Sequence, residues 1–96
     1  MHASVRRYRV RDMDALAAKL EAGFVEQVRQ IDGFVGYYVI DGGDGTSASV
    51  TVGEDATAVA ESVRLAGAWV RENAADLVDG EPEVTVGEVL VRAERD

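Results

Sequence analysis

Two stretches with helical periodicity, each lying between two strand-like runs, constrain the fold of this chain more than any other feature. The order is strand, helix, strand, turn, strand, helix, strand, and the central turn is the glycine-rich segment Asp41-Gly42-Gly43-Asp44-Gly45-Thr46. A β-α-β unit repeated around a hairpin has few compact arrangements, because each crossover has to be right-handed. The pattern therefore predicts a single α+β domain over residues 1–96.

The two helical stretches are expected at residues 13–30 and 55–77. In both, apolar residues recur every three or four positions and form one continuous stripe. Asp12 can cap the first helix, since its carboxylate can accept a bond from a free amide of the first turn, and Asp55 or Thr57 can cap the second. Gly33 can adopt the left-handed conformation that ends a helix, so we expect the first helix to stop just before it.

The strand-like runs are expected at residues 4–10, 34–41, 46–52 and 83–91. In the third run, Ser47, Ser49 and Thr51 share one face, which is polar but uncharged. This face is interpreted as a cavity wall or contact surface, with simple exposure as the alternative. The fourth run is apolar on both faces, which predicts helices on one side of it and another subunit on the other.

Right-handed crossovers predict a four-stranded, antiparallel sheet in the order four-one-three-two, with both helices on one face. This is the ferredoxin-like β-α-β-β-α-β arrangement. Within it, strands one and three are expected to be central and parallel to each other. The bare face then carries enough apolar surface to require a partner, and the simplest is a second copy of the chain in a symmetric, sheet-to-sheet homodimer.

The composition limits the possible partners. Eighteen acidic residues against ten basic ones leave a net charge of −8, which opposes general binding to nucleic acid. The sequence has no cysteine, so disulfides and thiolate metal sites are excluded, and we predict no metal and no cofactor. No apolar run approaches the length of about 18 residues that a membrane span needs, and no signal-peptide pattern occurs at the N-terminus. We therefore expect a cytoplasmic protein without membrane contact.

One basic cluster stands out against this acidic background. Arg6, Arg7, Arg9 and Arg11 lie within six positions of one another. They are interpreted either as an anion site or as arginines that alternate along a strand and pair with nearby acids.

The segment Ile31-Asp32-Gly33-Phe34-Val35-Gly36-Tyr37-Tyr38 resembles the end of the first helix and the second strand in the dimeric α+β barrel superfamily, in particular in antibiotic biosynthesis monooxygenase-like domains. The block Ser49-Val50-Thr51-Val52-Gly53-Glu54-Asp55 is similar to that family's junction between the third strand and the second helix. Trp69 falls on the second helix, where family members often carry an aromatic residue. The resemblance covers nearly the whole chain.

The resemblance implies a substrate cavity between the helices and the sheet of one subunit, and a dimer formed through the sheets. Members of the family include cofactor-independent oxygenases of polyketide phenols, haem-degrading enzymes and small proteins without known activity. The oxygenases carry an asparagine one turn before the tryptophan, where this chain has Leu65. The haem-degrading members add a histidine ligand, and the only histidine here is His2.

Two residues of the second helix are candidates for a ligand pocket. Trp69 can stack on a planar aromatic ligand, or it can serve as the largest core residue of an alanine-rich helix. Asn73 lies one turn later and can present its amide to the same ligand, or lie exposed at the helix end.

Three tyrosines are further candidates. Tyr8, Tyr37 and Tyr38 can each donate a phenolic hydrogen bond to a bound molecule, or they can be packing residues with a hydrated hydroxyl group.

Glu88 is the sixth candidate, because it shares a face with apolar residues of the fourth run. Burial would raise its pKa and suit it to general acid or base chemistry. Alternatively, it lies at a bulge, an edge or a dimer contact, where Arg7 or Arg9 can neutralise it.

Two functions from different classes follow. The first is a cofactor-independent monooxygenase acting on a small aromatic or polyketide-like substrate. The alternative is a non-catalytic homodimer that binds a small ligand or has a structural role.

Overall fold

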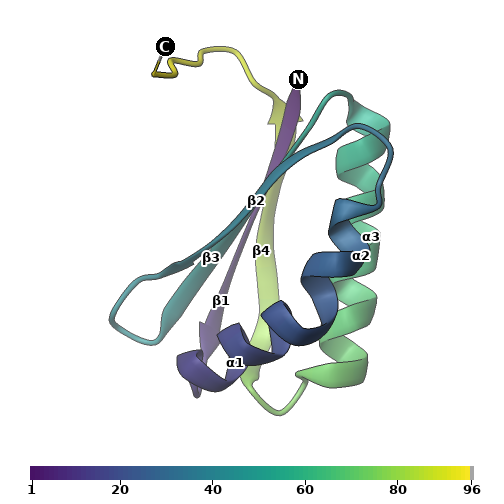
Figure 1. Cartoon of the computed structure of the whole chain (residues 1–96). Helices are drawn as coiled ribbons and strands as arrows, with labels where there is room; N and C mark the ends of the chain where they lie inside the picture. The colour runs from purple at the N-terminus through teal and green to yellow at the C-terminus, as the bar shows by residue number, and fades with distance from the viewer. Residues whose placement is uncertain (96) are drawn as a thin grey trace.

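A four-stranded sheet with helices on one face forms the fold, and the computed structural model describes residues 1–95 of it (Figure 1). In chain order the elements are β1 (His2–Val10), α1 (Met13–Lys19), the π-helical turn η1 (Leu20–Phe24), α2 (Val25–Arg29), β2 (Phe34–Asp41), β3 (Thr46–Gly53), α3 (Ala56–Asn73) and β4 (Val78–Glu88). The strand order is β2-β3-β1-β4, and every neighbouring pair is antiparallel. The predicted ferredoxin-like fold and sheet order are confirmed.

The relative direction of the two central strands differs from the prediction. β1 and β3 pair antiparallel, with Val5 opposite Val50, so the expectation of parallel central strands is wrong. The crossover through the first helical segment makes β2 parallel to β1, and the hairpin then reverses the direction of β3.

The first helical segment is not one regular helix. Asp12 caps α1 as predicted, because its Oδ1 accepts a hydrogen bond of 3.1 Å from the Ala15 amide. The helix then widens into the π-helical turn η1 before α2 continues the segment. The segment ends before Gly33, whose φ of 86° lies in the left-handed region, as expected for a helix stop.

The second helix is shorter than its periodicity predicts. Asp55 caps α3 by accepting a hydrogen bond of 2.9 Å from the Ala58 amide. The helix ends at Asn73, before the predicted end at residue 77, because the chain there already pairs with the sheet: the Leu77 carbonyl accepts a bond of 2.8 Å from the Arg11 amide.

β4 begins at Val78, five positions before the prediction, and contains Pro82. Residues 80–82 form a bulge opposite Tyr8. In the strand register Arg9 lies opposite Asp79 and Arg7 lies opposite Glu83, so residues 80–82 of β4 face the single residue Tyr8 of β1. Gly80 has a φ of 77°, which favours glycine at this bend. An edge strand tolerates a proline, since its outer amides have no strand to bond.

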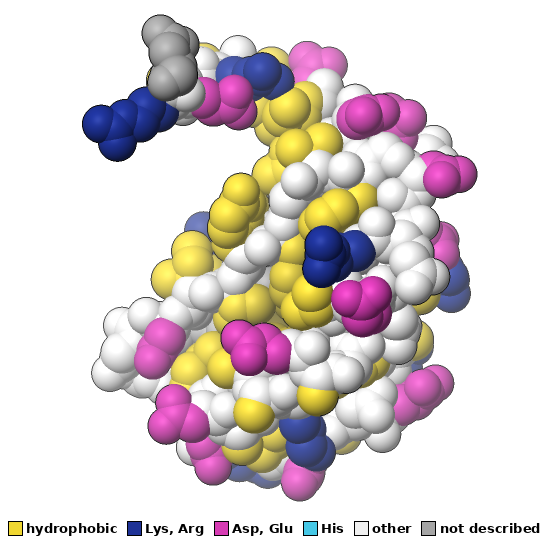
Figure 2. All heavy atoms as spheres, in the orientation of Figure 1, with side chains coloured by type: hydrophobic (Ala, Val, Ile, Leu, Met, Phe, Trp, Pro, Cys, Tyr) yellow, Lys and Arg dark blue, Asp and Glu magenta, His cyan; other side chains and the backbone are white. Residues whose placement is uncertain are grey.

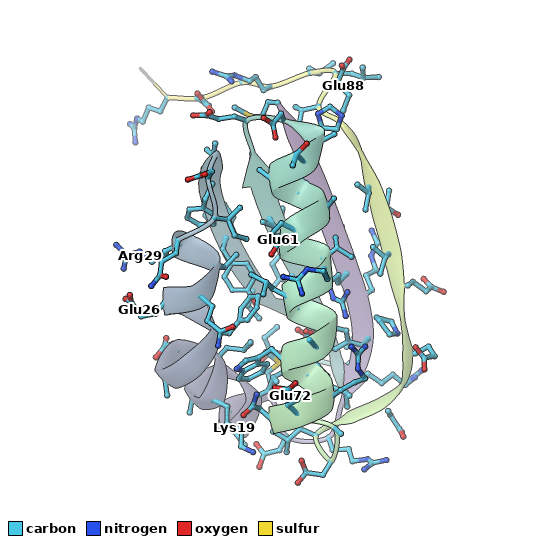
Figure 3. The ribbon with its side chains drawn as sticks, turned by 90° about the vertical axis from the view of Figure 1, so that its right-hand side faces the viewer. Lys19, Glu26, Arg29, Glu61, Glu72 and Glu88 are labelled. Atoms are coloured by element: carbon cyan, nitrogen blue, oxygen red, sulfur yellow. The ribbon has the colours of Figure 1, made fainter. Side chains whose placement is uncertain are left out.

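The apolar residues in the later part of β4 do not lie under a helix. Val84 and Val86 pair with Arg6 and Ser4, so they face the helix side of the sheet, yet they are 42% and 50% exposed. The expectation that helices cover one face of this strand is therefore wrong. β4 curves away from α3 at the edge of the sheet (Figure 3).

The helices enclose an apolar core over a partly polar floor. Core residues from the helical segments include Leu16, Leu20, Phe24, Val28 and Trp69. The buried polar side chains of the two central strands are Ser4 and Arg6 of β1 and Ser47, Ser49 and Thr51 of β3. The polar face of the third strand therefore lies under the helices, as a cavity wall or contact surface would, and is not exposed.

The opposite face of the sheet is bare. On β2, Tyr38 and Ile40 face this side and are 61% and 51% exposed. Hydrophobic side chains gather along the side of the sheet that lies away from the helices, on the left in Figure 2. Within residues 1–95, no helix is long and apolar enough to cross a membrane.

Candidate functional site

A hollow of about 660 Å³ lies between α3 and β4, where the bulge takes β4 away from the helix. Arg6 and Tyr8 of β1 line it from the sheet, Gly67 and Arg71 from α3, and residues 80–82 from β4. We call this space the α3–β4 hollow. Bulges occur often beside functional sites because they terminate regular pairing and redirect the chain.

Arg6 is the most unusual residue of this hollow. Its side chain is only 7% exposed, and its buried Nε has no hydrogen-bond partner among the described residues. The ion pairs within residues 1–95 join other side chains and leave Arg6 without a carboxylate. Burial of a guanidinium group without a counter-ion destabilises the folded protein by roughly several kcal/mol unless another group compensates the charge. Arg6 therefore places an unpaired positive charge at the floor of the hollow, where an anionic group would be stabilised.

The structure divides the arginine cluster that the sequence places together. Arg7 and Arg9 lie on the bare face of the sheet, away from Arg6. Arg11 forms an ion pair of 2.8 Å with Asp79 and donates a bond of 3.1 Å to the Asp76 carbonyl. Strand alternation thus describes Arg7 and Arg9, and acid pairing describes Arg11, whereas Arg6 is the member of this cluster that lines the hollow.

Two tyrosines lie near Arg6, the buried Tyr8 and the half-buried Tyr37. Burial raises the pKa of Tyr8, and the Arg6 charge and a hydrogen bond with Ser49 partly offset this. Burial also raises the pKa of Tyr37, and the proximity of Tyr8 adds to the rise while Arg6 opposes it. Both phenols therefore stay protonated at neutral pH and can donate hydrogen bonds.

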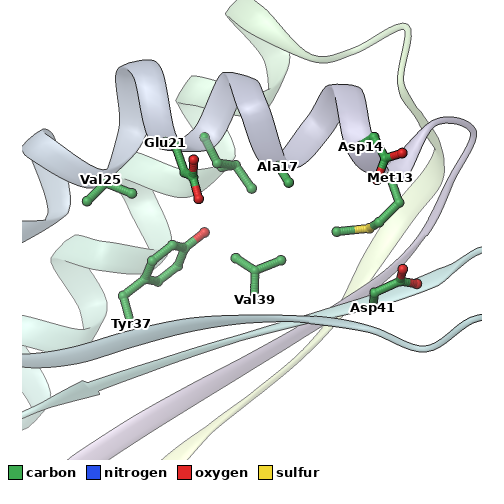
Figure 4. Close-up of a pocket in the computed structure, with 9 residues that line it drawn as sticks. Met13, Asp14, Ala17, Glu21, Val25, Tyr37, Val39 and Asp41 are labelled. Atoms are coloured by element: carbon green, nitrogen blue, oxygen red, sulfur yellow. The ribbon is translucent and has the colours of Figure 1, made fainter.

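Tyr37 also borders a second, smaller hollow of about 390 Å³ between α1, η1 and β2. Figure 4 shows its hydroxyl group directed into this space, with Glu21 above it and Val39 beside it. Asp14, Glu21 and Asp41 give this hollow an acidic rim, so it differs in charge from the α3–β4 hollow.

Trp69 lies inside the core. It is 6% exposed and packs against Phe24, with ring centroids 5.7 Å apart, and Phe24 in turn meets Tyr37 edge-on at 5.4 Å. Trp69, Tyr8 and Tyr37 line one interior void of about 10 Å³, which has room for about one water molecule. The structure thus brings these three candidates together, but around a space far smaller than an aromatic ligand.

Asn73 and Tyr38 lie elsewhere. Asn73 is exposed, and its Nδ2 donates a bond of 3.0 Å to the Trp69 carbonyl, so the amide caps the end of its own helix. Tyr38 is 61% exposed on the bare face, with the sheet between it and the α3–β4 hollow.

Glu88 lies at the far end of β4, opposite His2 (Figure 3). It is exposed, so the burial that its use as a general acid or base requires is not met. The expected neutralising partners lie elsewhere along β1: in the strand register Arg7 stands opposite Glu83 and Arg9 opposite Asp79, not opposite Glu88.

Sequence reasoning missed Gly67, Arg71 and the bulge. One signal was available: Gly67 and Arg71 are four residues apart, so they share a face of α3. The bulge had no such signal, because a glycine and a proline at residues 80–82 are typical of a turn that precedes a strand. Within residues 1–95, no group of three or more His, Cys, Asp or Glu side chains is placed to hold a metal ion.

No protein-family model matches the chain, and no curated protein matches it in sequence. The fold, however, is that of the antibiotic biosynthesis monooxygenase-type proteins, as the sequence resemblance predicts. One similar solved structure is the monooxygenase from the gene ActVA-Orf6 of Streptomyces coelicolor in complex with nanaomycin D. It is 18% identical, with a TM-score of 0.77, and the match covers 99% of this chain and 92% of that one.

Two further solved structures are similar over nearly their whole length. SnoaB, a cofactor-independent oxygenase from Streptomyces nogalater, is 16% identical with a TM-score of 0.72, over 98% of this chain and 97% of that one. NE2512, a protein of unknown function from Nitrosomonas europaea, is 18% identical with a TM-score of 0.77, over 99% and 94%. At these identities the likeness is one of fold.

Proposed function

We propose that this protein is a cofactor-independent monooxygenase that binds a small phenolic aromatic molecule in the α3–β4 hollow. The observation that carries the proposal is Arg6, a buried residue whose guanidinium has no ion pair within residues 1–95 and borders a hollow of about 660 Å³. A phenol beside a fixed positive charge loses its proton more readily, because the charge stabilises the phenolate. The phenolate is also the electron-rich form that can reduce O₂ directly.

In the proposed reaction the phenol supplies all four electrons that O₂ accepts. One oxygen atom becomes the new carbonyl oxygen of a quinone, and the other leaves as water with the phenolic hydrogen and one ring hydrogen. Arg6 stabilises the phenolate from which the first electron leaves, and the protonated Tyr8 donates a hydrogen bond in the same hollow. The reaction therefore needs no reductant besides the substrate and no oxidant besides O₂.

The fold supports this proposal, since two similar structures are described as a monooxygenase and a cofactor-independent oxygenase. The size of the hollow agrees with it as well, because small-molecule sites usually measure about 300–1,000 Å³.

A homodimer formed through the bare sheet face is part of the same proposal. Tyr38 and Ile40 expose about half or more of their surface there. An apolar sheet face of this kind is normally covered, and a second copy offers a matching face.

The test uses 1,5-dihydroxynaphthalene, whose oxidation by one O₂ yields a coloured hydroxyquinone and one water. We expect the protein, treated with EDTA, to accelerate oxygen uptake and quinone formation over the buffer rate. Arg6→Gln should reduce the acceleration at least about tenfold, since one charge-assisted contact is lost. Arg29→Gln is the matched control, because Arg29 lies on α2, away from β4 (Figure 3).

The alternative function is a non-catalytic dimer that binds a small ligand. It is favoured by the scarcity of acid–base groups in the hollow, where Glu81 is the only carboxylate. Binding of the naphthalenediol without faster oxygen uptake would favour this alternative, whereas no binding at all would refute both functions for this class of molecule.

A further inference from the structure

Arg71 provides the α3–β4 hollow with a second cation. Its Nη1 lies 3.5 Å from the point where a Cβ atom on Gly67 would stand, so the side chain folds back along α3 over the preceding turn. Both residues line the hollow. Because Gly67 has no side chain, the Arg71 guanidinium has room to lie against the helix at this position, beside the hollow.

The third arginine of the hollow differs from these two. Arg64 forms a two-pronged ion pair with Glu61, in which its Nε donates a bond of 3.0 Å and its Nη2 contacts the other carboxylate oxygen. Within residues 1–95, neither Arg6 nor Arg71 has an ion pair of this kind. Their two charges face a single carboxylate in the hollow, that of Glu81.

This local excess of positive charge occurs in a chain whose net charge is −8. A cleft lined by one sign of charge concentrates its field on ligands of the opposite sign. Two uncompensated guanidinium groups, one buried on the floor and one on the helix wall, suit a molecule with two acidic groups. A planar guanidinium also matches the geometry of a carboxylate better than that of a hydroxyl group.

We propose that the natural ligand of this hollow is a hydroxyaryl carboxylic acid, whose carboxylate binds Arg71 while its phenolic oxygen meets Arg6. The inference rests on the proposed function, because it uses the same hollow, but it concerns the acid group and a different residue. Arg71 is thus a specificity-determining residue that selects for the acid group, whereas Arg6 contacts the phenolic oxygen of any phenol that binds in the hollow.

The test compares 3-hydroxy-2-naphthoate with 3-hydroxy-2-naphthamide, a neutral molecule of nearly the same shape, by isothermal titration calorimetry at pH 7.5. We expect the wild-type protein to bind the acid about tenfold more tightly than the amide, the effect of one charge-assisted contact. R71Q should remove this preference by weakening the acid much more than the amide, and because Arg71 is exposed the fold does not depend on it. R71K should keep part of the preference, and R29Q all of it.

The outcomes separate the two proposals. If both molecules bind with equal affinity to the wild type and R6Q weakens both, the hydroxyaryl acid inference is overturned and the phenol site stands. If R64Q removes the preference and R71Q does not, the assignment to Arg71 is wrong. If neither molecule binds, both proposals fail.

Discussion

Nε1 of Trp69 lies 3.3 Å from the point where a Cβ atom on Gly23 would stand. Gly23 is part of the π-helical turn η1, and Trp69 is part of α3. The glycine thus lets the first helical segment meet the indole edge in the core. The neighbouring Phe24 packs on the same ring, which prevents the indole from moving aside.

Gly23→Ala should therefore lower the stability of the protein. A methyl group at this point overpacks a tight core contact, which typically costs about 1–3 kcal/mol, and the better helix propensity of alanine returns about 1 kcal/mol. We expect a net loss of about 1 kcal/mol in the free energy of unfolding, measured by urea denaturation.

Gly67→Ala is the matched comparison, because the added Cβ would meet only Arg71 Nη1 at an ordinary contact distance of 3.5 Å. This change should raise the free energy of unfolding by about 0.5–1 kcal/mol through helix propensity. Equal effects of the two substitutions would contradict the tight contact between Gly23 and Trp69.

Replacing Arg6 by methionine should make the protein more stable and remove phenol binding. A buried charge without a partner destabilises a fold, and an apolar side chain of similar length can gain about 1–4 kcal/mol. Urea denaturation and titration with 1,5-dihydroxynaphthalene measure the two effects. Arg29→Met, an exposed substitution, should change stability by less than about 0.5 kcal/mol. A loss of stability in Arg6→Met would mean that Arg6 has a structural role instead.

Alkaline pH should destabilise the protein through Tyr37, which is half-buried against the core. Burial raises the pKa of Tyr37 above its ordinary value of 10.0, so the unfolded chain releases this proton at a lower pH than the folded one. The contribution is fully present below pH 10 and is lost as the pH rises further. When the pH rises from 8 to 11, we expect the free energy of unfolding of Tyr37→Phe to fall by about 1 kcal/mol less than that of the wild type. Tyr38→Phe should show the wild-type loss, because Tyr37 is still present.

Ile40→Glu should convert the proposed dimer into a monomer. Ile40 is 51% exposed on the bare face, so in a dimer built through this face the glutamate would be buried without a partner. Light scattering at micromolar concentration should report a fall from twice the mass of the chain to once. Val84→Glu alters a residue of similar exposure on the helix side of β4 and should leave the dimer intact. A wild-type monomer would refute the interface.

The fold was predictable wherever short-range signals decide it. Asp12 and Asp55 cap their helices as expected, Gly33 stops the first segment, and the glycine-rich loop joins β2 to β3. β4 was placed too late because Gly80 and Pro82 normally end a pattern. At a sheet edge they form a bulge instead, which only the register against β1 reveals.

The candidate site was less predictable, because a residue's type does not tell what surrounds it. Tyr8 and Tyr37 were identified as possible ligand contacts, and they do lie near Arg6. Arg6 itself was one of four similar arginines, and its isolation follows from which face of β1 turns inward.

Residues only a few positions apart specify the order of the elements, the helix caps and the alternation of β1, so all three follow from local patterns in the chain. The burial of Arg6 without a counter-ion and the position of Arg71 beside the same hollow do not follow from local patterns. Those relationships join β1, α3 and β4, and they arise only when the bulge and the packing of α3 set the distances between residues far apart in the chain.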